Sequence, residues 1–339
     1  MPPAWEAGYA GRRALVTGGA GFIGSHVARR LVQLGATVTI VDALIPDCGG
    51  NLFNIADLRE QVHLRIADLR DREAIEDLVC DPDFVFNLAG QVSHIDSMIR
   101  PVDDLELNCV AHISLLEACR RRNPGVRIVY AGTRQAYGRP RYLPVDERHP
   151  RIPTDINGIN KMAGEAYHLL YHRLHGMRAT SLRLTNTFGP GLLIRHPRQG
   201  FLSVFLRRVL DDEPIRVYGD GSQLRDLNYV DDVVAAFLAV AADDATVGEA
   251  LNLGSDPPLS LRQVAELMIE IAGSGRVERV PFPDDLKRID IGSYYGDFAR
   301  IRAAVGWQPQ VPVAEGLRRT LAYYRRNARH YIAGDEVEP

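Results

Sequence analysis

The sequence predicts an α/β fold, with a doubly wound parallel sheet followed by a smaller, mixed C-terminal lobe. Short β-rich runs alternate with helical patterns through the first half of the chain, and this alternation breaks down after residue 186. The 339 residues are enough for one large unit or two modest domains. We expect a sheet domain over residues 10–186, with parts of the C-terminal half returning to it, and a lobe formed mainly by residues 187–330.

Each predicted strand is a short apolar or β-branched run, and each predicted helix carries apolar residues at helical spacing. In the first helix these are Ile23, Val27, Leu31 and Leu34. Strands are predicted over residues 13–18, 37–42, 62–68, 83–89, 127–133 and 179–186, and further helices over 72–78, 103–122 and 157–175. Residues 189–200 are rich in Gly, Pro and basic side chains and predict a loop, after which shorter segments such as 213–221 begin.

A glycine-rich turn joins the first strand to the first helix. Residues 17–24 are Thr-Gly-Gly-Ala-Gly-Phe-Ile-Gly, and such glycines let backbone N–H groups approach a pyrophosphate at a helix N-terminus. Asp42 ends the next strand, where a carboxylate accepts hydrogen bonds from ribose hydroxyls and repels a 2′-phosphate. No arginine occurs at residues 43–47 to bind such a phosphate. The pattern therefore predicts a Rossmann-like domain that binds NAD rather than NADP.

Composition excludes several other classes of protein. The chain has 46% hydrophobic and 24% charged residues and a formal net charge of −3. This slightly negative charge argues against a nucleic-acid-binding protein. No apolar run approaches the length of a membrane span, and the N-terminus lacks the pattern of a signal peptide. The four cysteines contain no CxxC pair and suit a reducing compartment, so we expect a cytoplasmic protein without a thiolate metal site.

These motifs resemble those of extended short-chain dehydrogenases/reductases, in the NAD-dependent nucleotide-sugar epimerase/dehydratase family. The resemblance runs from the glycine turn to the stretch IRAAVGWQP at residues 301–309, and includes GDGSQLRDLNYVDD at 219–232. Residues 90–93, Ser97 and the spacing of 132–138 are most similar to CDP-sugar 2-epimerases and UDP-sugar 4-epimerases. The resemblance implies a nucleotide-diphosphate sugar as substrate and a homodimer paired through the helices at 103–122 and 157–175.

The resemblance also implies a set of binding residues. Those for the cofactor are Gly18, Gly21, Phe22, Ile23, Gly24, Asp42, Asp68, Leu69, Leu88, Ala89, Gly90 and Lys161. Those for the nucleotide sugar are Ser93, Asn186, Tyr218, Arg225, Arg288 and Asp297. An arginine at position 225 suits a diphosphate because its guanidinium can bind phosphate oxygens with two N–H groups.

The catalytic positions show one departure from the family pattern. Family members combine a Ser or Thr, a Tyr that accepts a proton, and a Lys that lowers the pKa of the Tyr and binds the nicotinamide ribose. Thr133 and Lys161 match two of these positions, whereas Asn157 occupies that of the Tyr. An amide can orient a hydroxyl but cannot accept a proton at physiological pH. Lys161 is one of only two lysines, with Lys287, among 40 basic residues, which favours an intact cofactor site.

Three interpretations of Asn157 remain open. Another base acts, with Asp96, His94 or a substrate group as candidates, while Asn157 orients the substrate. Alternatively, the protein carries out a redox step that differs from ordinary sugar oxidation, or it binds NAD and nucleotide sugar without turnover. Dehydratases that resemble this chain carry Asp-Glu directly after the Thr, and decarboxylases of the family usually carry a Glu there. This chain has Arg134 and Gln135 at these positions. Elimination is therefore disfavoured, and an NAD-dependent epimerase that transiently oxidises the sugar is the first hypothesis.

Two further groups of basic residues have alternative interpretations. His168, His172 and His175 share a helix face, and we interpret this face as solvated or subunit-facing rather than as a metal site. Arg195, His196 and Arg198 follow Asn186 and are predicted either to recognise phosphate or a sugar carboxylate, or to form a solvated loop.

Overall fold

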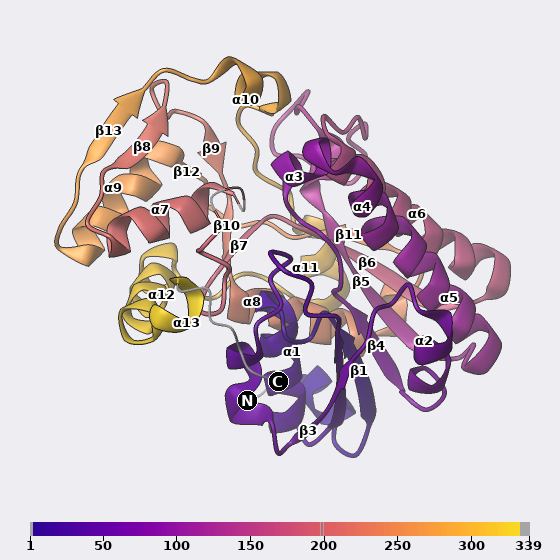
Figure 1. The fold of residues 1–339 in the computed structure, drawn as a ribbon. Coiled ribbons are helices and arrows are strands. Elements are labelled where there is room, and N and C mark those ends of the chain that lie inside the picture. Colours follow the sequence, from indigo (N-terminus) through magenta and orange to yellow (C-terminus); the bar gives the residue numbers. More distant parts are fainter. Residues whose placement is uncertain (1–2, 197, 199, 333–339) are drawn as a thin grey trace.

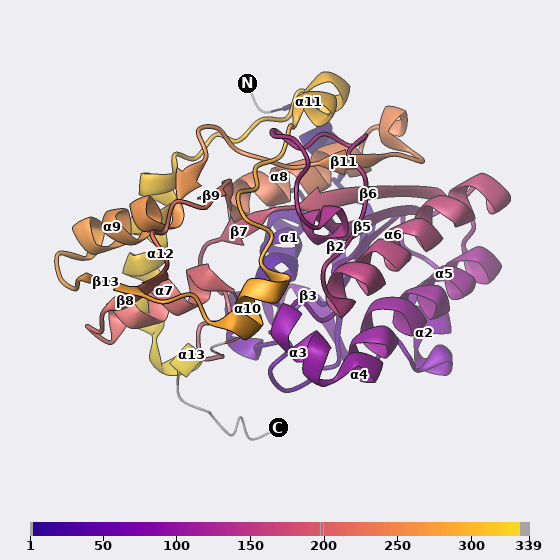
Figure 2. The same cartoon turned by 90° about the horizontal axis from the view of Figure 1, so that it is seen from above.

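The computed structural model describes residues 3–196, 198 and 200–332, so residues 197 and 199 of the predicted loop lie outside the description (Figures 1 and 2). At its centre is a seven-stranded parallel sheet in the order β11-β6-β5-β4-β1-β2-β3. Its strands are β1 (Arg13–Thr17), β2 (Thr37–Asp42), β3 (Val62–Ile66), β4 (Phe84–Asn87), β5 (Arg127–Thr133), β6 (Arg178–Leu184) and β11 (Ala250–Asn252). The chain order reverses between β1 and β4, which confirms the doubly wound prediction.

Helices cover both faces of this sheet (Figure 1). On one face α1 (Phe22–Gln33) packs against α8 (Val230–Ala241), and on the other α5 (Ala111–Arg122) packs against α2 (Arg72–Leu78) and α6 (Ile156–His175). Successive side chains of each strand point to opposite faces, so Phe86 and Val85 of β4 belong to separate apolar clusters. Both faces of the sheet are therefore buried, as a parallel sheet requires.

The segment before α5 differs from the single helix predicted over residues 103–122. It consists of α3 (His94–Ile99), which was not predicted, α4 (Pro101–Leu105), and a π-helical turn (Glu106–Val110) that leads into α5. The π turn places Asn108 and Cys109 in the interior. Such turns insert one extra residue into a helix, and the spacing of apolar residues does not show them.

The smaller lobe is built from short paired strands and helices (Figure 2). β8 (Ile215–Tyr218) pairs with β13 (Val277–Val280), β9 (Leu224–Arg225) with β12 (Leu259–Ser260), and β7 (Asn186–Phe188) with β10 (Leu227–Tyr229). Its helices are α7 (Phe201–Leu210), α9 (Leu261–Ala272), α10 (Asp284–Ile289), α12 (Val313–Asn327) and α13 (Arg329–Ile332), whereas α11 (Ala299–Val305) contacts β11 of the large sheet. Within the second half, α8 and β11 pack on the large sheet, while the domain division at residues 186 and 187 stays a prediction.

The apolar core on the α1 and α8 side continues into the smaller lobe. Phe188, Leu206 and Leu317, from three different elements, are all buried in it. This continuity fixes the lobe against the edge of the sheet. Within the described part of the chain, no helix is both long and apolar enough to cross a membrane.

Candidate active site

A cavity of about 480 Å³ lies at the carboxyl ends of the sheet strands, where the chain order reverses between β1 and β4. Ligands of open α/β sheets bind at this place, because the loops that leave adjacent strands diverge there. The cavity brings together these predicted residues: Gly18, Gly21, Phe22, Ile23, Gly24, Asp42, Asp68, Leu69, Leu88, Ala89, Gly90, Thr133, Asn157, Lys161, Asn186 and Arg225.

Four predicted residues do not line the cavity. Ser93 caps α3, and its hydroxyl donates to the carbonyl of Arg198 at 2.9 Å. Tyr218 ends β8 and packs against Phe282, with ring centroids 5.3 Å apart. Arg288 lies in α10, and the carboxylate of Asp297 accepts from the backbone N–H of Ala299 at 2.7 Å. Their binding roles stay predictions.

The glycine turn has the shape needed to hold a pyrophosphate. Gly18 has a φ of +64°, and a Cβ on Gly24 would lie 2.2 Å from the carbonyl oxygen of Gly18. Gly21 caps α1 without a side-chain hydrogen bond, so the backbone N–H groups of the first helical turn stay available to a ligand in the cavity. A β-carbon at position 18 would clash with the backbone of Ala89, and one at position 24 with the backbone of the turn itself, so this shape requires glycine at both positions.

Two carboxylates line the other end of the cofactor region. Asp42 accepts from the backbone N–H groups of Ala20 at 3.0 Å and Leu44 at 2.9 Å, which fixes its orientation at the end of β2. Burial raises the pKa of Asp42, and these hydrogen bonds oppose the effect. Asp68 instead pairs with Arg70, whose hydrogen bond lowers the pKa of the carboxylate. Asp42 therefore fits the predicted ribose contact, while the carboxylate of Asp68 already has a partner.

Lys161 is buried at 5% exposure, and its Nζ lies 4.7 Å from the ring centroid of Tyr130. Tyr130 belongs to β5, the strand that ends at Thr133. Burial lowers the pKa of Lys161 to about 8, against the opposing charges of Asp104 and Cys109. Its ammonium is therefore poised to donate to a ligand in the cavity, because ligand oxygens would replace the lost water.

Asn157 begins the turn of α6 that leads to Lys161, and its side chain is tied into the protein. The amide nitrogen donates to the carbonyl of Gln91 at 2.8 Å and to Asp104 at 2.9 Å. Asp104 also accepts from Asn160 at 2.9 Å. Both N–H groups of Asn157 are thus used, and only its carbonyl oxygen, without a partner among the described residues, is left to orient a substrate.

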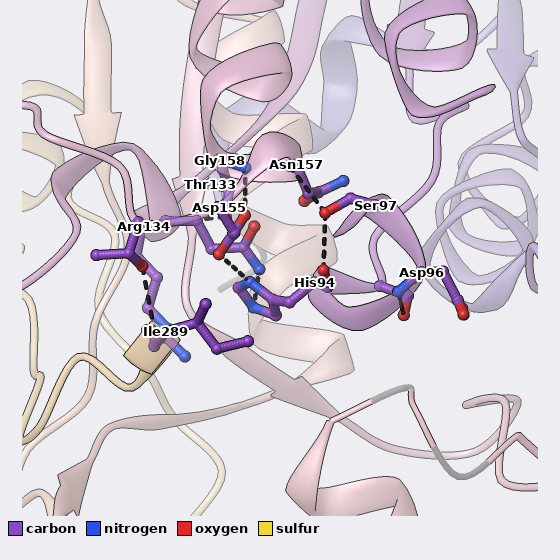
Figure 3. Close-up of polar contacts among 12 residues, drawn as sticks. His94, Asp96, Ser97, Thr133, Arg134, Asp155, Asn157, Gly158 and Ile289 are labelled. Carbon is purple, nitrogen blue, oxygen red and sulfur yellow. Dashed lines mark hydrogen bonds and ion pairs between the residues drawn. The ribbon is translucent and has the colours of Figure 1, made fainter. Parts of the chain in front are cut away.

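The two protein groups predicted as alternative bases have different surroundings (Figure 3). Nδ1 of His94 lies 2.6 Å from the carboxylate of Asp155, and its Nε2 contacts the side-chain amide of Gln135. Gln135 lines the cavity, whereas His94 lies behind it. Asp96 forms an ion pair with Arg198 at 2.6 Å and does not line the cavity. His94 is therefore the better placed of the two.

Arg134 and Gln135 are cavity residues that the sequence singled out only as replacements for an acidic pair. They follow Thr133 in a short 3-10 turn (Arg134–Tyr137), whose backbone N–H at Gln135 donates to the Thr133 hydroxyl at 3.2 Å. Nη2 of Arg134 donates to Asn186 at 3.3 Å. Their position directly after Thr133 could have located both residues in the sequence, but not the direction of either side chain.

The structure contradicts part of what was expected for the three helix histidines, and it shows the partners of the arginines in the basic loop. His168 is fully buried, with Nδ1 2.7 Å from the carbonyl of Gly164, so its assignment to a solvated or subunit-facing surface is wrong. It faces the interior because α6 packs on β5 and β6 along that side. In the basic loop, Arg195 pairs with Asp47 and Arg198 with Asp96. Within the described residues, no group of three or more His, Cys, Asp or Glu side chains could hold a metal ion.

Comparison with known proteins identifies similar sequences and structures. Residues 14–254 match the model of the NAD dependent epimerase/dehydratase family. A putative UDP-glucose 4-epimerase of Methanocaldococcus jannaschii is 33% identical over 319 residues, which cover 93% of this chain and 99% of that protein.

Solved structures agree with this match. A UDP-glucose 4-epimerase from Thermotoga maritima, solved with UDP-glucose, has a TM-score of 0.84 at 31% identity, covering 93% of this chain and 99% of its own. A UDP-glucose 4-epimerase from Thermus thermophilus, solved with NAD, has a TM-score of 0.82 at 32% identity, covering 92% and 99%.

Proposed function

Since this chain belongs to the NAD-dependent epimerase/dehydratase family, we propose that it is an epimerase of nucleotide-diphosphate sugars. The observation that carries the proposal is that one cavity joins the glycine turn and Asp42 to Thr133 and Lys161. When bound there, NAD supplies the hydride acceptor and donor for a reversible oxidation of the sugar. The glycine turn would hold the pyrophosphate, Asp42 the adenosine ribose and Lys161 the nicotinamide ribose.

The residues after Thr133 support epimerisation over elimination. Loss of water from a sugar needs an acid and a base close to the reacting carbons. Arg134 cannot be deprotonated in a protein, and the amide of Gln135 neither gives nor takes a proton. Thr133 is left to position the reacting hydroxyl, with the free carbonyl oxygen of Asn157 as a second hydrogen-bond acceptor.

For the proton acceptor we propose His94. Asp155 accepts a hydrogen bond from Nδ1, which fixes the tautomer so that Nε2 carries the lone pair. Gln135 covers Nε2 from the cavity, so the assignment requires the Gln135 side chain to turn aside when the sugar binds. Asp155 is held in place because its other oxygen accepts from the backbone N–H of Gly158 at 2.7 Å.

The test is incubation of the NAD-loaded protein with UDP-, dTDP- and CDP-sugars, while NMR follows the sugar and absorbance follows NADH. We expect one sugar inverted at a single carbon, with a transient NADH signal. A product that has lost water or carbon dioxide would replace the epimerase assignment with an elimination enzyme. Tight binding of a sugar nucleotide without product or NADH would instead support the alternative, a noncatalytic NAD and nucleotide-sugar binding protein.

The role of His94 is tested by H94N, with H63N on the exposed part of β3 as its matched control. H94N is expected to lower kcat by about 10²- to 10⁴-fold, since it removes the base. Affinity for NAD and sugar should stay unchanged in both variants. A full kcat in H94N would contradict the assignment, and the proton acceptor would then lie elsewhere in the cavity.

A further inference from the structure

Two arginines line the cavity on its sugar side, and they differ in how the protein holds them. Arg225 of β9 is 7% exposed, and its guanidinium donates to the carbonyl oxygens of Leu224 and Gly292. It also lies 3.8 Å from the carboxylate of Asp290. Burial lowers the pKa of Arg225 to about 10, and the positive charge of Arg134 adds to this effect. The two guanidinium groups are therefore close enough to repel each other.

Arg134 has no ion pair among the described residues. Uncharged groups hold it: Nη2 donates to Asn186 at 3.3 Å, and the guanidinium carbon lies 5.0 Å from the ring centroid of Tyr294. Its Nη1 is buried without a hydrogen-bond partner. The side chain of this half-buried residue is thus fixed in direction while its Nη1 stays without a hydrogen bond, which is unfavourable for a charged group.

The carboxylates that interact with Arg134 at longer range are already engaged. Asp226 accepts from the Thr185 hydroxyl and from the backbone N–H of Gly296 at 2.8 Å. Asp155 is bound to His94 and to the N–H of Gly158. The other arginines near this region, Arg195 and Arg198, have their own ion pairs, so among these three only Arg134 has no ion pair in the described part of the chain.

We propose that Arg134 binds a carboxylate on the sugar, so that the substrate is a nucleotide-diphosphate sugar with an acidic sugar. This inference rests on the proposed function. Arg134 directly follows Thr133, the residue expected to face the reacting hydroxyl, and both residues line the cavity. Its charge therefore belongs to the sugar end of the cavity, while Arg225 remains for the diphosphate. A guanidinium and a carboxylate can form two parallel hydrogen bonds, which a neutral sugar cannot reproduce.

The experiment compares the binding of UDP, UDP-glucose and UDP-glucuronic acid to the NAD-saturated protein by calorimetry. The variants are R134M, R134Q and the matched control R141M, whose exposed arginine does not line this cavity. For the unaltered protein we expect the acidic sugar nucleotide to bind about tenfold or more tightly than the neutral one. R134M and R134Q should lose this preference while keeping the affinity for UDP and UDP-glucose, and R141M should keep it.

Equal affinity of the unaltered protein for the acidic and neutral sugars would overturn the inference and leave the proposed function standing. A similar loss of affinity for UDP itself in R134M and R134Q would assign Arg134 to the diphosphate, and would also overturn it. Retained binding of UDP shows that the variants are folded. If no UDP-, dTDP- or CDP-sugar binds to the NAD-saturated protein, the proposed function fails, and this inference fails with it.

Discussion

At the scale of single residues, Asp104 interacts with both Asn157 and Lys161: it accepts a hydrogen bond from Asn157, and its negative charge opposes the lowering of the pKa of Lys161. The carboxylate of Asp104 accepts hydrogen bonds from two amides, those of Asn157 and Asn160. Within the described residues no carboxylate lies in ion-pair distance of Lys161, whose ammonium faces the ring of Tyr130 instead. The sequence predicted the positions of Lys161 and Asn157, but not this arrangement, because Asp104 lies more than fifty residues earlier in the chain.

The burial of Lys161 predicts a stability that depends on pH in the cofactor-free protein. Its pKa is about 8 when folded, against an ordinary value of 10.5. Between these values the unfolded chain binds the proton and the folded chain does not, so stability rises with pH. Relative to K161M, the unaltered protein should gain about 3 kcal/mol of unfolding free energy as pH rises from 8 to above 10.5. It should lose this gain as pH falls from 10.5 to 8, and below pH 8 the difference should stay constant because both states then hold the proton.

Urea unfolding of the cofactor-free protein across this pH range measures the difference. The control is K287M, which removes the other lysine of the chain from an exposed position. Its effect on stability should be about 1 kcal/mol or less throughout, because solvent screens an exposed charge. A stability difference between K161M and the unaltered protein that does not change with pH would contradict the effect of burial on Lys161.

At the scale of elements, the parts predicted well are those whose pattern is local. β2, β5 and α2 coincide with the predicted residues, because strand alternation and helical spacing are properties of neighbouring residues. α3 was missed because six residues are too few for a helical period to show, and the π turn was missed because it shifts that period. Contacts between elements were beyond prediction, and the buried pair of Glu165 and Arg183 is an example.

Glu165 connects α6 to β6 and predicts a large loss of stability when its charge is removed. Its two oxygens accept from Arg183 at 2.6 and 2.9 Å, and Ser181 donates to it at 3.0 Å. Both side chains of the pair are at most 5% exposed. E165Q leaves Arg183 as an uncompensated buried charge, so unfolding free energy should fall by about 3–5 kcal/mol in urea denaturation.

The matched control is D244N, which neutralises the exposed ion pair of Asp244 with Arg178. Asp244 is 80% exposed, and solvent screens such a pair, so the expected loss is about 1 kcal/mol or less. An E165Q variant as stable as D244N would show that water reaches Arg183 once the pair is broken.

At the scale of the whole molecule, the cavity combines segments from both halves of the chain. The glycine turn and Asp42 could be placed there from sequence, because a strand, a turn and a helix follow one another directly. Ser93, Tyr218, Arg288 and Asp297 were grouped with them by resemblance, and they lie outside this cavity. Which loops of the smaller lobe reach the cavity depends on how the lobe packs on the sheet, and no local pattern contains that information.

The outer surface of α3 to α6 predicts how two copies of the chain associate. Apolar side chains are exposed along these neighbouring helices, and they are Met98, Ile99, Val102, Leu105, Val110, Ile159, Leu170 and Leu174. Val102 is 63% and Leu174 66% exposed. Exposed apolar side chains on neighbouring helices favour association. The helices predicted by resemblance to pair, 103–122 and 157–175, carry five of these eight side chains, and Met98, Ile99 and Val102 directly precede the first of them.

We expect the unaltered protein to elute as a dimer in size-exclusion chromatography with light scattering, and V102E combined with L174E to shift it to the monomer. In a symmetric dimer both copies carry each substitution, so every new carboxylate enters the interface twice. Removing these charges from water is unfavourable and strongly opposes pairing. The control is I66E, because Ile66 on β3 is similarly exposed at 57% but lies outside this surface. If the dimer persists in V102E with L174E but dissociates in I66E, the interface lies at the β3 edge of the sheet. If the unaltered protein is a monomer, the predicted homodimer is wrong.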